Sequence, residues 1–67
     1  MPDFKSKVAF DNVSIISETP NAILCVIDGV KYWIPLSQVD DDSEVWKSGE
    51  EGKLVISEWI ANEKRLI

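Results

Sequence analysis

Residues 22–35 have the sequence AILCVIDGVKYWIP, in which Asp28-Gly29 joins two apolar runs. An Asp-Gly pair between such runs is a strong signal for a β-hairpin, because a type I′ turn needs positive φ at both central positions. The two-residue turn also sets the register of the strands. The predicted cross-strand pairs, whose side chains share one face, are Ile27–Val30, Cys25–Tyr32 and Ile23–Ile34.

The opposite face of this hairpin is largely apolar as well. It carries Leu24, Val26 and Trp33, with Lys31 as its one charged residue. Because an open antiparallel sheet usually exposes one polar face to water, we expect the hairpin to be covered on both faces. The inside of a small barrel would cover one face, and a helix or an arm of the chain would cover the other.

Short strands are predicted on both sides of the hairpin. The β-branched residues of 13–18 favour a strand, which ends near Pro20 because proline lacks the main-chain N–H that a central strand needs. Residues 8–10 form either a short first strand or, within residues 1–12, an arm that lies on the barrel. The remaining predicted elements are a single 3₁₀ turn at 36–39, a strand at 43–46, a turn at 47–52 and a strand at 53–56.

The C-terminal residues predict one short helix. Ser57 can cap its N-terminus, and Glu58 suits the positive end of the helix dipole. The apolar residues at 59–60 would face inward, and Lys64 and Arg65 would lie in the last turn. With about two turns, such a helix is stable only when it docks on the rest of the protein.

These elements together predict the fold class. Many short strands followed by one helix are typical of a mainly β domain. We expect a single domain over residues 1–67, built as a small SH3-like or OB-like barrel of about five strands with a short C-terminal helix.

The composition limits the chemistry. The chain has 67 residues, of which 45% are hydrophobic, and a net charge of −5. Histidine is absent and Cys25 is the single cysteine. The chain therefore lacks an internal disulfide, enough nitrogen and sulfur ligands for structural zinc, and the usual catalytic base. The negative charge disfavours nucleic acid and anionic membranes. We expect no enzymatic activity, cofactor or metal, and a cytoplasmic location.

The stretch 40–51 holds six of the twelve acidic residues. Its first carboxylates have the spacing of a calcium-binding loop, but Val45 stands where that loop needs glycine for its sharp turn. Two interpretations remain open, a solvated loop that keeps the domain soluble and a surface that mimics nucleic acid and occupies a basic groove. The candidate contacts to a basic partner are Asp40, Asp41, Asp42 and Glu44.

The aromatic residues allow a second kind of contact. Tyr32 and Trp33 alternate along one predicted strand, so one of them points away from the inside. OB-folds stack bases on such residues, but Lys31 is the only basic residue close by. Both aromatics can also belong to the core or lie under the helix. An exposed aromatic would mark a protein interface, and Tyr32 and Trp46 are the candidate contacts to an apolar partner.

From residue 13 onward the chain resembles a type of short protein found in phages and other bacterial mobile elements. The residues that carry the likeness are Ala22-Ile23-Leu24, Ile27-Asp28-Gly29, Trp33-Ile34-Pro35, Ser37-Gln38, Ser43-Glu44-Val45 and Leu54-Val55-Ile56-Ser57-Glu58-Trp59-Ile60. The resemblance implies a phage-like origin and a non-enzymatic accessory role in the cytoplasm of a host cell. It transfers no functional residue.

The function expected from these observations is that of a non-enzymatic protein-interaction module. Its partner would be another protein, such as a basic nucleic-acid-binding host protein, or a second copy of the chain. A phage-type protein of this kind can inhibit a host machine such as a defence system. Two alternatives remain open, an oligomer that sequesters a small nucleotide-like ligand and a barrel that binds single-stranded nucleic acid.

Overall fold

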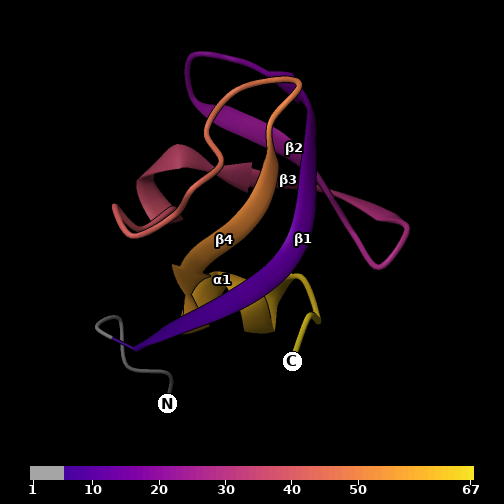
Figure 1. The fold of residues 1–67 in the computed structure, drawn as a ribbon. Coiled ribbons are helices and arrows are strands. Elements are labelled where there is room, and N and C mark those ends of the chain that lie inside the picture. Colours follow the sequence, from indigo (N-terminus) through magenta and orange to yellow (C-terminus); the bar gives the residue numbers. More distant parts are fainter. Residues whose placement is uncertain (1–5) are drawn as a thin grey trace.

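The computed structural model describes residues 6–67, which form a mainly β fold (Figure 1). One antiparallel sheet has the strand order β3-β2-β1-β4. Its strands are β1 (Lys7–Glu18), β2 (Ala22–Ile27), β3 (Val30–Pro35) and β4 (Glu51–Ser57). A 3₁₀ turn, η1 (Leu36–Gln38), follows β3, and the helix α1 (Glu58–Glu63) follows β4. Within this part of the chain, no helix has the length and apolar character needed to cross a membrane.

The central hairpin has the predicted turn and register. Asp28 and Gly29 have φ values of 52° and 79°, as a type I′ turn requires. The pairs Ile27–Val30, Cys25–Tyr32 and Ile23–Ile34 are all present in the ladder between β2 and β3. Local turn chemistry therefore fixed this part of the fold.

The first strand is longer than predicted. Residues 8–10 and 13–18 belong to one strand, β1, which continues through a bulge at Asp11 and Asn12. Asn12 has a φ of 57°, a conformation that asparagine tolerates better than most residues. The pairing of β1 with β4 continues through the bulge from Lys7 to Ser14, and its pairing with β2 runs from Ser14 to Glu18. Residues 1–5 of the predicted arm lie outside the described residues.

A second irregularity lies at Ile16, between the pairs Ile15–Cys25 and Ser17–Leu24. The extra residue shifts the alternation along β1. Glu18 consequently pairs with the buried Ile23, whereas strict alternation along β1 would place Glu18 on the same face as Ser14 and Ile16.

The core lies on one face of the sheet. It also includes residues of α1 and, from the chain between η1 and β4, Val39 and Val45. Its fully or nearly fully buried members are Val13, Ile15, Ile23, Cys25, Ile27, Ile34, Val39, Val45, Leu54, Ile56, Ile60 and Ala61. The helix α1 lies beside the end of the sheet where β1 begins and β4 ends (Figure 1). Its main contacts are with β4 and β1, two strands outside the β2–β3 hairpin.

The helix has a complete set of caps. The Ser57 hydroxyl accepts a hydrogen bond from Ile60 N at 3.3 Å, as predicted. At the other end, Arg65 N donates to Asn62 O and Leu66 N donates to Ala61 O, the two bonds of a Schellman motif. The helix ends at Glu63. Lys64 and Arg65 therefore lie beyond the last turn, in which they were predicted.

The sheet is not closed into a barrel, and it has four strands. Residues 43–46, predicted as a strand, have no strand conformation. The chain does follow β4 from 39 to 44, starting with an isolated bridge between Val39 and Ile56. The reason that no regular strand forms is Ser43, whose hydroxyl accepts from Val55 N and donates to Val55 O. A side chain thus takes the place of a main-chain partner.

The outer face of the hairpin is not covered, contrary to the expectation from its apolar pattern. The side chains of Leu24 and Val26 are partly buried, whereas Trp33 is 45% exposed and Ile16 of β1 is 44% exposed. The free hairpin end lies away from α1 (Figure 1). An apolar surface is therefore open on this side of the sheet.

Candidate protein-binding surface

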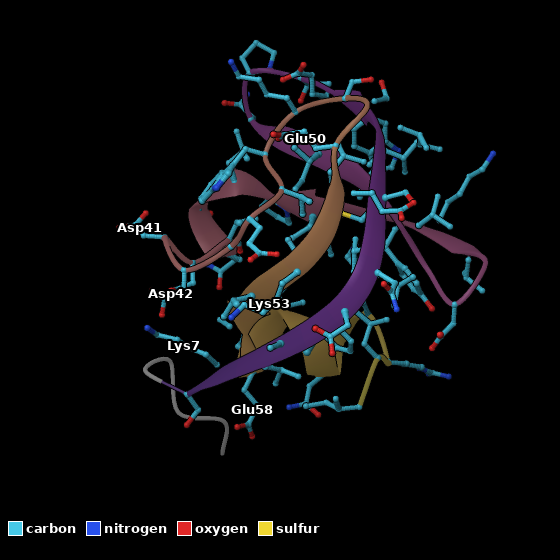
Figure 2. The ribbon with its side chains drawn as sticks, in the orientation of Figure 1. Lys7, Asp41, Asp42, Glu50, Lys53 and Glu58 are labelled. Atoms are coloured by element: carbon cyan, nitrogen blue, oxygen red, sulfur yellow. The ribbon has the colours of Figure 1, made fainter. Side chains whose placement is uncertain are left out.

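Residues 40–51, here called the acidic segment, run from just after η1 to the first residue of β4. Residues 40–44 lie along the outer edge of β4, whereas residues 48–50 bond to Ile15 and Ile16 of β1. The segment contains six carboxylates and one basic residue, Lys47. In Figure 2, Asp41 and Asp42 lie on the outer side of the loop, at the left, with Lys7 below them. The structure thus places the carboxylates of residues 40–44 at the edge of the sheet opposite β3.

The main chain of the acidic segment is fixed to β4. Asp40 N donates to Val55 O at 2.8 Å, and Glu44 N donates to Lys53 O at 2.8 Å. Between them, the Ser43 hydroxyl bonds to both main-chain groups of Val55, at 2.8 and 2.9 Å. Val45, which is 1% exposed, anchors the segment in the core. The loop is therefore held at several points and presents its charges in a defined arrangement.

Asp40 is the structural member of the aspartate run. Its Oδ2 accepts a hydrogen bond from Asp42 N at 2.9 Å, and its Oδ1 lies 3.0 Å from Lys7 Nζ. The bond from Asp42 N, followed by that from Lys7, holds the pKa of Asp40 below its ordinary value. The same ion pair raises the pKa of Lys7. Asp40 is charged at neutral pH, but its charge is partly neutralised.

Asp41 and Asp42 point into solvent. The side chain of Asp42 is 73% exposed, and its Oδ2 lies at 3.8 Å from Lys7 Nζ. Asp41 is exposed as well. These two side chains are therefore accessible to a partner.

Three glutamates of the acidic segment combine negative charge with a local hydrogen bond. Glu50 Oε1 accepts from Trp46 N and Lys47 N, both at 2.7 Å. These two bonds lower the pKa of Glu50. Glu44 accepts from Lys53 N at 3.1 Å, and Glu51 accepts from the Ser14 hydroxyl at 3.0 Å. Glu44 is exposed, so the predicted contacts Asp41, Asp42 and Glu44 are all accessible.

The two predicted aromatic contacts lie largely inward. Tyr32 and Trp46 are partly buried and pack against the core. The Trp46 indole Nε1 also donates to Ser43 O at 3.0 Å, which fixes the ring over the loop. Among the tryptophans, Trp33 is the exposed one. The signal that identifies it is its place in the hairpin, since period-2 alternation puts Trp33 on the same face as the charged Lys31.

The described residues offer little chemistry beyond charge. No three carboxylate or thiol side chains among them are grouped as metal ligands. Burial raises the pKa of the Cys25 thiol to about 11, so the thiol is protonated and weakly nucleophilic at neutral pH. An open depression beside α1 is lined by Trp59, Asn62, Glu63 and Arg65. The exposed carboxylates and the fixed main chain of the acidic segment are suited to binding through charge and shape.

No protein-family model matches this chain, and no curated protein or solved structure matches it either. The resemblance to short phage proteins therefore stays a prediction.

Proposed function

We propose that the protein is a non-enzymatic interaction module whose acidic segment binds a basic, nucleic-acid-binding protein. The observation that carries this proposal is the fixed main chain of the segment. Residues 40, 43 and 44 bond to β4, and Asp41 and Asp42 project from this frame. A loop that is ordered before binding loses less conformational entropy when it binds.

Electrostatics supports the same partner class. The acidic segment offers several carboxylates within one short loop, and Lys7 pairs mainly with Asp40. A concentrated negative surface attracts a basic groove and speeds association with it. The pKa values of Asp40 and Glu50 lie below their ordinary values, so both carboxylates keep their charge at neutral and mildly acidic pH.

We also propose that the fold is related to SH3-like or OB-like barrels. The run of residues 39–44 along β4 supports an SH3-like or OB-like relation, because this run occupies the position of a fifth strand. The bulged β1, shared between β2 and β4, is a second feature in its favour, since bulges bend strands at barrel corners.

The biological setting of the proposal rests on the resemblance to phage proteins. A small acidic protein of phage type, acting in the cytoplasm of a host cell, would inhibit a host protein by occupying its nucleic-acid groove. A bacterial defence protein is the partner that best fits such a role. Single-stranded nucleic acid is the weaker candidate ligand, because the exposed Trp33 has only Lys31 as a basic neighbour on its strand.

The salt dependence of capture tests this function. We would immobilise the chain, expose it to nuclease-treated bacterial lysate, and wash it at increasing salt. We expect basic proteins to be retained at low salt and released at about 1 M salt, where the Debye length is about 3 Å. Captured proteins that are neutral or acidic, or that resist this salt concentration, would contradict the proposal.

A further inference from the structure

The two edge strands of the sheet differ in whether another part of the chain covers them. The edge of β4 is covered by residues 39–44. At the other edge, β3 pairs with β2 alone. Outside that ladder, no main-chain hydrogen bond within residues 6–67 involves Lys31 or Trp33. An uncovered strand edge is a template for pairing with another strand.

The register shows which main-chain groups this edge offers. In a two-residue hairpin the residues that flank the turn, Ile27 and Val30, form a hydrogen-bonded pair, and such pairs alternate along the ladder. The main-chain groups of Tyr32 therefore face β2. Those of Lys31 and Trp33 point outward, and Pro35 has no N–H to offer. The edge thus presents two donors and two acceptors before the proline interrupts it.

We propose that two copies of this chain pair through their β3 edges around a twofold axis at Tyr32. This register sets Lys31 of each copy opposite Trp33 of the other as hydrogen-bonded pairs. All outward N–H and C=O groups of these residues then have partners. The two sheets become one continuous antiparallel sheet.

The side chains are complementary in the same register. Lys31 and Trp33 lie on the outer face of the hairpin, and directly opposed residues of an antiparallel pair share a face. Each exposed indole therefore meets a lysine of the second copy, an arrangement that favours a cation–π contact. A shift by two residues would lose this match, because Trp33 would then face Gly29 or Trp33 itself.

The distribution of charge permits this contact, and its twofold symmetry limits it to two copies. Residues 40–44 of the acidic segment lie along β4, at the far end of the strand order from β3, so their carboxylates stay at the outer ends of the joined sheet. Lys31 is the only charged residue of β3. Because both copies use the same β3 edge around a twofold axis, the pairing is isologous and closed.

Sedimentation equilibrium over a concentration series tests the proposal. We expect the wild-type mass to rise reversibly from 7.6 kDa toward twice that value. Trp33→Lys sets a lysine opposite Lys31 of the second copy and should stay monomeric. Trp33→Glu sets a carboxylate there and should retain association. A monomeric wild type, association in Trp33→Lys, or its loss in Trp33→Glu would each overturn the proposal.

Amide hydrogen exchange on the unmodified protein gives a second test that does not depend on the variants folding. Protection of the Lys31 and Trp33 amides should increase with protein concentration, whereas that of Tyr32 should stay constant because its amide already faces β2. If the exchange rates of the Lys31 and Trp33 amides did not change with protein concentration, the self-pairing would be overturned. The β3 edge would then be open to an extended segment of another protein.

Discussion

Single residues decide how the acidic segment is held. The Ser43 hydroxyl forms hydrogen bonds of 2.8 and 2.9 Å with the main chain of Val55, and both residues are buried. The hydroxyl thus pairs the Val55 N–H, a donor that a regular fifth strand would otherwise pair, and it shares the Val55 carbonyl with Asp40 N. The geometry of the loop depends on this hydroxyl, because a buried main-chain N–H without a partner is costly.

We predict that Ser43→Ala destabilises the protein by about 1–3 kcal/mol, the cost of leaving a buried polar group unpaired. Urea unfolding followed by tryptophan fluorescence measures this loss. Ser37→Ala in the exposed part of η1 is the matched control and should change the unfolding free energy by less than about 0.5 kcal/mol. Equal effects of the two substitutions would show that the Ser43 hydroxyl does not hold the segment.

Cys25 makes the stability sensitive to alkaline pH. Burial raises its pKa from the ordinary 9.0 to about 11, so between these pH values the thiol ionises in the unfolded chain and stays protonated in the folded one. The unfolded state then binds fewer protons, and stability falls as pH rises, by up to about 1.4 kcal/mol per pH unit.

The comparison with Cys25→Ala isolates this effect, because the other titrating groups are common to both proteins. We predict that the difference in unfolding free energy between wild type and Cys25→Ala shifts against the wild type from pH 9 to pH 11. Urea unfolding at several pH values measures it. A constant difference would mean that burial does not suppress ionisation of the thiol.

At the scale of elements, the sequence predicted correctly the turns and caps that depend on neighbouring residues. The turn at Asp28-Gly29, the 3₁₀ turn and the Ser57 cap were all predicted, because each depends on residues close together in the chain. The continuity of β1 was not predicted, since Asp11 and Asn12 have the composition of a turn and the bulge depends on pairing with β4. The strand predicted at residues 43–46 was wrong for a similar reason, because Val55, the partner of Ser43, is distant in sequence.

The C-terminal cap of α1 contains a strained residue. Arg65 has a φ of 58° at the position where Schellman motifs usually have glycine. We predict that Arg65→Gly stabilises the protein by about 1 kcal/mol, because the left-handed conformation costs about 1–2 kcal/mol for residues with a Cβ. Thermal unfolding measures the gain.

Lys64→Gly is the matched control for this prediction. Lys64 has a φ of −89°, which needs no glycine, so the substitution should destabilise the protein by about 0.5–1 kcal/mol through the added freedom of the unfolded chain. If both substitutions changed stability in the same direction, backbone strain at Arg65 would not be the cause.

At the scale of the whole molecule, the two surfaces with functional potential lie at opposite edges of the sheet. Residues 40–44 of the acidic segment follow β4, and the exposed Trp33 lies on β3. The sequence alone predicted that Asp41, Asp42 and Glu44 are exposed, because a run of charges stays at the surface whatever the fold. It did not separate Trp33 from Tyr32 and Trp46, since the burial of an aromatic residue depends on which face the rest of the chain covers.

Charge reversal tests the acidic segment as the binding surface most directly. Asp41→Lys with Asp42→Lys reverses the two exposed aspartates and leaves Asp40 in place, and Asp11→Lys with Glu63→Lys gives the same change in net charge at exposed positions outside the segment. Both variants and the wild type would be compared in quantitative capture from nuclease-treated bacterial lysate. We predict that reversal at 41 and 42 abolishes capture of the basic proteins, while reversal at 11 and 63 preserves most of it. Undiminished capture by the variant at 41 and 42 would contradict the proposed function.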